Sequence, residues 1–150
     1  MITNKKATHD YHILERWEAG VVLKGSEVKS IREGKVNFID SFVRVISGEL
    51  FLHNLHIALY ARTSQPNLDP KRPRKLLLHH GEIRKLIGTL SQKGLTLIPL
   101  SIYFKKGKVK VGIGLAKGKR LYDKRRKLRE ISIDREIKRT LKERKRYYPH

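Results

Sequence analysis

The chain has 150 residues, enough for one ordinary domain with an appendage, and an apolar share of 39% that supports one modest core. Its 35 Lys and Arg residues outnumber its 14 Asp and Glu residues, which gives a formal net charge of +21. Because like charges repel within a compact fold, this surplus indicates a polyanionic partner, nucleic acid before an anionic membrane, and the absence of cysteine excludes disulfides and thiolate chemistry.

The N-terminal residues carry charge instead of an apolar stretch. Asn4, Lys5 and Lys6 follow Met1 closely, and no hydrophobic region of the kind found in a secretory signal comes after them. No run in the chain has the length that a membrane-spanning helix needs. The sequence therefore predicts a cytoplasmic protein with no membrane partner.

Residues 11–60 combine extended segments with one short helix. Residues 11–23 favour a strand that is interrupted at Ala19 and Gly20, and residues 25–33 favour a helix that Gly34 ends. A hairpin follows, with residues 42–46 and 49–60 as its arms and Ser47 and Gly48 as its turn. One face of the second arm is expected to hold Phe51, His53, Leu55, Ile57 and Leu59.

The second half of the chain again combines predicted strands with one helix. Residues 62–75 contain three prolines and predict a loop, and an apolar stripe at residues 83–90 predicts a helix that ends at Gly94. Residues 95–104 and 109–115 form a second predicted hairpin around Lys106 and Gly107. Its first arm is expected to place one set of side chains on a common face, namely Thr96, Ile98, Leu100, Ile102 and Phe104. The pattern indicates a mainly β protein with flanking helices, built as an OB-like antiparallel β-barrel.

The C-terminal segment has a different composition. Residues 117–150 hold fifteen Lys or Arg and five Asp or Glu, a net charge of +10 in 34 residues. We expect a barrel domain over residues 1–127 and a basic tail over residues 128–150. Repulsion among its cations predicts a tail that is disordered in the free protein and helical once phosphates screen it; a helix packed on the barrel is the alternative.

No catalytic constellation stands out. His79, His80 and Glu82 lack the spacing of zinc motifs, and no glycine-rich phosphate loop is present. Asp40, Asp69 and Glu82 could in principle hold Mg²⁺ for a nuclease, but they are scattered among turn signals. We therefore expect a binding protein without metal, cofactor or enzymatic activity. A metal-dependent nuclease and a structural ribosomal protein with a basic extension are the alternative hypotheses.

Four sequence blocks occur in order along the chain. They are Asn4-Lys5-Lys6-Ala7 with His9-Asp10-Tyr11 and Glu18-Ala19-Gly20; Gly25-Ser26-Glu27-Val28-Lys29-Ser30 with Asp40-Ser41; Arg74-Lys75-Leu76-Leu77-Leu78-His79; and Ala116-Lys117-Gly118-Lys119 with Tyr122-Asp123-Lys124-Arg125. Together these blocks resemble the SsrA-binding protein (small protein B) family. The resemblance implies an RNA-binding protein of trans-translation, the rescue of stalled ribosomes, and we expect it to be a monomer. Its implied partners are the tRNA-like domain of transfer-messenger RNA (tmRNA, or SsrA RNA) and the ribosome, including small-subunit rRNA, with the tail acting in the decoding site and messenger channel.

The resemblance also implies roles for individual residues. Positions that the family associates with RNA binding match Asn4, His9, Tyr11 and Glu18, and the tail motif linked to ribosome function matches Tyr122, Asp123, Lys124 and Arg125. Cations beside these motifs can neutralise phosphates, namely Lys5, Lys6, Lys117, Lys119 and Arg120. Glu18 cannot attract phosphate, so we expect it to position a cation or to accept a hydrogen bond from a base amino group. The leucines at positions 76–78 are expected in the core.

Overall fold

The structure is a computed structural model that describes residues 1–61, 66–92 and 94–118. Within these ranges the chain forms nine strands and three helices. In chain order they are β1 (Ile2–Thr3), α1 (Lys5–Asp10), β2 (Tyr11–Val21), α2 (Gly25–Arg32), β3 (Val36–Asn37), β4 (Phe42–Ile46), β5 (Glu49–His53), β6 (His56–Ile57), β7 (Arg74–Leu77), α3 (His80–Leu90), β8 (Leu95–Lys105) and β9 (Lys108–Gly118). None of the described helices is long and apolar enough to cross a membrane.

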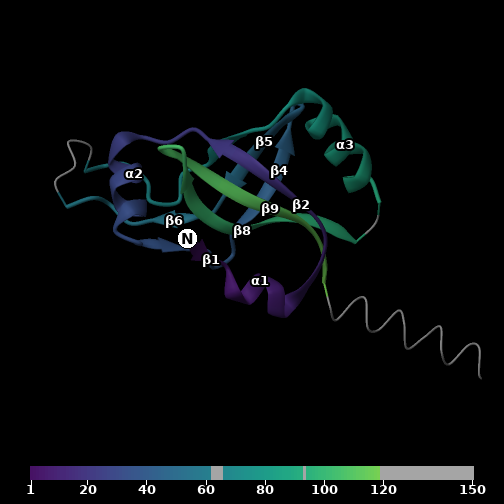
Figure 1. The fold of residues 1–150 in the computed structure, drawn as a ribbon, viewed down its shortest axis with the longest axis horizontal. Coiled ribbons are helices and arrows are strands. Elements are labelled where there is room, and N and C mark those ends of the chain that lie inside the picture. Colours follow the sequence, from purple (N-terminus) through teal and green to yellow (C-terminus); the bar gives the residue numbers. More distant parts are fainter. Residues whose placement is uncertain (62–65, 93, 119–150) are drawn as a thin grey trace, which may run out of the picture.

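The main sheet closes into a barrel. Its strands follow the order β1-β8-β4-β5-β7-β2-β9, and β8 also pairs with β9, so the ring from β8 back to β8 is complete. Every strand pair is antiparallel, and β1 adds to β8 outside the ring. The three helices lie around this barrel (Figure 1). The predicted OB-like antiparallel barrel with flanking helices is confirmed.

Both predicted hairpins are present. Ser47 and Gly48 join β4 to β5, and Lys106 and Gly107 join β8 to β9, all with positive φ. Two consecutive positive φ values twist a two-residue turn in the sense that matches the strand twist. The β9 side chains then alternate as expected, with Val109, Val111, Ile113 and Leu115 buried in the barrel.

The interruption expected in the first strand is wrong. β2 runs without a break through Ala19 and Gly20, which pair with Val111 and Lys110 of β9. Ala19 is fully buried, and at Gly20 an added Cβ would lie 3.3 Å from the Cβ of Leu77. These two small residues therefore allow close packing inside a strand instead of ending it.

The expected face of β8 is also wrong in part. The register of β8 against β9 shifts between Pro99 and Ser101, so the alternation of side chains changes along the strand. Leu97 and Ile102 both enter the barrel core, whereas Ile98 and Leu100 join a second cluster with Ala7 and Ala116 beneath α1. Phe104 is 39% exposed.

The second arm of the first hairpin is shorter than expected. β5 ends at His53 because Asn54 has a φ of 60°, and its buried residues are Leu50 and Leu52, not Phe51. The predicted loop over residues 62–75 is likewise too long, since Arg74 begins β7. Arg74 is only 1% exposed, which the sequence did not indicate for a residue of a basic, proline-rich segment.

A buried carboxylate joins α2 to the segment that enters the barrel at β7. Glu27 accepts hydrogen bonds from Arg74 Nε at 2.6 Å and from two nitrogens of Arg72. Glu27 also accepts from the backbone N–H of Lys24 at 2.8 Å, which fixes the first turn of α2. Burial alone would raise the pKa of Glu27, but the bonds from Arg72 and Lys24 and the charge of Arg74 together hold this pKa below its ordinary value of 4.5.

The guanidinium of Arg74 extends the same network to two loops. It donates to the backbone carbonyls of Leu55 at 2.6 Å and Pro70 at 2.9 Å. Burial lowers the pKa of Arg74, and the charge of Glu27 opposes that shift. All three nitrogens of this buried cation therefore have acceptors, which is the condition under which a charge is tolerated in a protein interior.

Replacing Glu27 by Gln should destabilise the fold strongly. The substitution leaves two guanidinium groups, one of them fully buried, without their counter-charge, and we expect the free energy of unfolding to fall by about 3–5 kcal/mol in urea denaturation. Glu49→Gln removes one partner of the exposed Lys75–Glu49 pair and should cost about 0.5 kcal/mol or less. Equal effects of the two substitutions would contradict the role given to Glu27.

The same carboxylate predicts an acid-sensitive stability. Because the pKa of Glu27 is lower in the folded chain than in the unfolded chain, its contribution is complete above pH 4.5 and is lost as the pH falls through the lower folded value. Urea denaturation at a series of pH values below neutrality should show this loss in the wild type, with a smaller loss in Glu27→Gln.

Candidate nucleic-acid interface

The N-terminal end of the barrel is organised by Asn4. Its side-chain oxygen accepts from the backbone N–H of Ala7 at 3.3 Å and caps α1, while its amide nitrogen donates to the Pro99 carbonyl at 2.8 Å. Its backbone N–H donates to the Leu100 carbonyl at 2.8 Å. Asn4 therefore fixes both the start of α1 and the position of α1 on β8.

The structure brings five further sequence-predicted residues to this end. Lys5, Lys6 and His9 are exposed on α1, and His9 Nδ1 lies 3.0 Å from a carboxylate oxygen of Asp10. Tyr11 begins β2 opposite Gly118, and the next residue pairs with Lys117, so the end of β9 lies beside the end of α1. Tyr11 is half-buried against the second apolar cluster.

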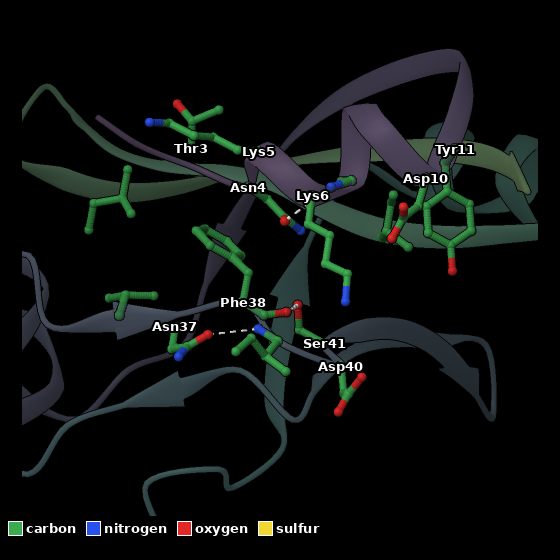
Figure 2. Close-up of a pocket in the computed structure, with 15 residues that line it drawn as sticks. Thr3, Asn4, Lys5, Lys6, Asp10, Tyr11, Asn37, Phe38, Asp40 and Ser41 are labelled. Atoms are coloured by element: carbon green, nitrogen blue, oxygen red, sulfur yellow. Dashed lines mark hydrogen bonds between the residues drawn. The ribbon is translucent and has the colours of Figure 1, made fainter. Parts of the chain in front are cut away.

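A cleft of about 350 Å³ opens between this end and the chain that precedes β4. Figure 2 shows the Lys6 side chain extending from α1 toward Ser41 and Asp40, with Tyr11 at the side of the cleft. Asp40 lies on the lower rim, and its φ of 60° sets the sharp turn there. The cleft thus combines cations, an aromatic ring and carboxylates, which is a suitable mixture for phosphate and base contacts.

Glu18 lies apart from that group. It is seven residues further along β2 than Tyr11, about 20 Å at the usual rise of a strand, and it pairs with Gly112. Its carboxylate accepts from Tyr103 Oη at 2.5 Å and from Lys105 Nζ at 3.3 Å. The hydrogen bond from Tyr103 and the charges of Lys105 and Lys110 lower the pKa of Glu18, so it is ionised at neutral pH.

Glu18 forms one wall of a groove that the sequence did not predict. The groove holds about 650 Å³ between the β8–β9 turn and the start of α3, and Leu77, Lys108 and Lys110 line it. The expectation that the leucine block is core is correct for Leu76, which is 2% exposed, and wrong for Leu77, which is 50% exposed. Strand alternation explains the difference, because neighbouring residues of β7 face opposite sides.

The alternative of a metal-dependent nuclease finds no support in the described ranges. There, no group of three or more His, Asp or Glu side chains lies close enough to hold a metal ion, and Asp40, Asp69 and Glu82 are not brought together. Other sequence-predicted residues lie outside the described residues, namely Lys119, Arg120, Tyr122, Asp123, Lys124 and Arg125.

Basic surfaces on a small closed antiparallel barrel define the class of this protein, a compact nucleic-acid-binding barrel. The model of the SmpB protein family matches residues 1–143. The SsrA-binding protein of Carboxydothermus hydrogenoformans is 55% identical over 141 residues, covering 94% of this chain and 95% of that protein. The SsrA-binding protein of Acetivibrio thermocellus is 56% identical over 140 residues, covering 93% and 91%.

A solved structure agrees with these relatives. It is described as "tmRNA-SmpB: a journey to the center of the bacterial ribosome" and is similar to this chain with a TM-score of 0.67 and 58% sequence identity, covering 79% of this chain and 83% of that chain. The chain belongs to the SmpB family.

Asn4→Ala should loosen α1 from the barrel. The change removes the cap on Ala7 and the donor to Pro99, and we expect the free energy of unfolding to fall by about 1–2 kcal/mol in urea denaturation. Asn4→Asp is the matched control: it keeps the capping acceptor, loses the donor and should lie between the wild type and Asn4→Ala. An Asn4→Ala protein as stable as the wild type would show that Asn4 does not hold α1.

Proposed function

We propose that this protein binds the tRNA-like domain of tmRNA and delivers it to stalled bacterial ribosomes in trans-translation. It acts in the cytoplasm as a monomer and without catalysis. The observation that carries the proposal is the match to the SmpB family over residues 1–143, together with relatives that are named SsrA-binding proteins. The similar solved structure, whose description names tmRNA, SmpB and the ribosome, supports both partners.

The geometry supports recognition of RNA at two separate surfaces of the barrel. One is the α1 end, with Lys5, Lys6, His9, Tyr11 and Lys117, and the other is the groove with Glu18, Leu77, Lys108 and Lys110. Exposed lysines neutralise phosphates without reading the sequence of the RNA. Half-buried aromatic and exposed apolar side chains add contacts that only a folded RNA with unstacked bases can use.

We assign the barrel and the tail different tasks. Residues 1–127 form the domain that holds tmRNA, and the basic residues 128–150 contact the ribosome in the decoding site and messenger channel. Tyr122, Asp123, Lys124 and Arg125, which precede the tail, also act on the ribosome. The basic composition of residues 128–150, with eight Lys or Arg against four Asp or Glu, supports this division, because ribosomal RNA is a second polyanion.

The wild-type protein should bind purified tmRNA without cleaving it. Deletion of residues 128–150 should leave the dissociation constant for tmRNA within about threefold of the wild-type value, because the proposed RNA contacts are on the barrel. The same deletion should abolish tagging of a nascent peptide on stalled ribosomes. A truncated protein that no longer binds tmRNA would overturn the division of tasks, and a wild-type protein that ignores or degrades tmRNA would overturn the proposed function.

Lysines of α1 should contribute to the salt dependence of binding. For Lys5→Ala combined with Lys6→Ala we expect the slope of log K against log salt concentration to become shallower by about 1–2, as for the loss of one or two phosphate contacts. Lys29→Ala combined with Lys35→Ala is the control, since these two exposed lysines near α2 line neither the cleft nor the groove. Equal slope changes in both double variants would contradict a specific role for α1.

A further inference from the structure

A third hollow lies on the outer face of the barrel where β2, β9 and β8 run side by side. Gly112 of β9 pairs with Glu18 on one side and with Ser101 on the other, and it contributes no side chain to this face. A Cβ at position 112 would lie 2.7 Å from Ser101 Oγ, so the glycine keeps the surface open. The hollow holds about 310 Å³, and Arg16, Glu18 and Tyr103 are among the residues that line it.

The Glu18 carboxylate is oriented at the edge of this hollow. Tyr103 and Lys105, both on β8, donate to it across β9. Burial and the bond to Glu18 raise the pKa of Tyr103 to about 12, so its hydroxyl stays protonated and keeps donating. A carboxylate has about four acceptor positions, and these two donors do not use all of them.

A carboxylate on a surface that must attract phosphate needs an explanation. Its charge opposes binding to the RNA backbone. One benefit is that it holds Lys105 in place through their ion pair, and a second would come from a group of the RNA that donates hydrogen bonds. Among the four bases, only guanine presents two adjacent donors on its Watson–Crick edge, the N1–H and the 2-amino group. The two oxygens of a carboxylate match this pair, as they match the parallel donors of a guanidinium.

We propose that this hollow binds one unstacked guanine of the RNA, with Glu18 accepting from its N1–H and 2-amino groups. Tyr103 is the positioning residue that holds the Glu18 carboxylate, and the exposed Arg16 pairs with the phosphate of the same nucleotide. The inference rests on the proposed binding of tmRNA and names the base contact within it. The volume of the hollow is near the lower end of the range for small-ligand sites, about 300–1,000 Å³, and so suits a single nucleotide.

Inosine tests this assignment because it is guanosine without the 2-amino group. We expect the wild-type protein to bind an inosine-substituted transcript of the tmRNA tRNA-like domain about tenfold more weakly than the unsubstituted transcript. Glu18→Gln should bind both transcripts with nearly equal, reduced affinity. A change in RNA folding caused by inosine would weaken binding of both proteins alike, so comparing the ratio of the two dissociation constants between the proteins corrects for it. A wild-type ratio equal to that of Glu18→Gln would overturn the proposal.

Tyr103→Phe tests the positioning role. It should weaken tmRNA binding by about threefold, and the double variant with Glu18→Gln should bind no more weakly than Glu18→Gln alone. By NMR, the Glu18 carboxyl should titrate at a higher pH in Tyr103→Phe than in the wild type, closer to 4.5, which a purely structural tyrosine would not cause. An unchanged titration, or additive losses of affinity, would exclude the positioning role.

Glu49→Gln is the matched control, since Glu49 is also an exposed strand carboxylate paired with a lysine but lies on β5, outside the hollow. It should bind both transcripts as the wild type does. The experiment also separates this inference from the proposed function. A wild-type protein that fails to bind tmRNA removes the function, whereas one that binds tmRNA tightly but does not distinguish inosine removes only the guanine contact.

Discussion

The buried ion pair of Glu27 with Arg74 is the constraint on which the arrangement of the barrel depends. Glu27 belongs to α2, Arg74 opens β7, and the guanidinium of Arg74 also holds the backbone at Leu55 and Pro70. Three parts of the chain, namely α2, the backbone at Leu55 and the segment from Pro70 to Arg74, are thereby fixed around one charge pair. An isolated charge in this place would cost several kcal/mol, so the fold is stable only when all of these partners assemble together. Leu77, which lines the groove, lies three residues after Arg74 on β7, so its position depends on the same ion pair.

Much of the fold could be predicted from the sequence where local physics decides it. The turns at Ser47-Gly48 and Lys106-Gly107 and the alternation from Val109 to Leu115 are set by neighbouring residues, and the structure has them as expected. The prediction for the first strand failed because contacts between distant segments decide its course. The break expected at Ala19 and Gly20 is wrong because β9 and Leu77 pack against these small residues. The bulge in β8 begins at Pro99, which cannot donate a ladder hydrogen bond and is tolerated at bulges, so the strict alternation expected for this strand fails there.

For the candidate site, too, the sequence predicted individual residues but not the contacts between distant segments. The sequence predicted RNA contacts at Asn4, Lys5, Lys6, His9, Tyr11 and Lys117, and the structure places these residues together at one end of the barrel. The helix α1 that carries three of them was not predicted. The sequence could not reveal that Asn4 donates to the Pro99 carbonyl, or that Tyr103 and Lys105 hold Glu18, since each of these pairings joins residues 85 to 95 positions apart. A run of three leucines carries no signal for which one faces outward, so the sequence alone predicts Leu77 in the core.

The register shift at Pro99 to Ser101 has a mechanical consequence. One end of this short stretch of backbone anchors Asn4, through the carbonyls of Pro99 and Leu100, and the other end abuts Gly112 at the floor of the hollow. The α1 end and the glycine-floored face are therefore held at a fixed spacing by a few peptide units inside a closed barrel. An RNA that uses both of the proposed contact surfaces must therefore present its two contact points at that spacing.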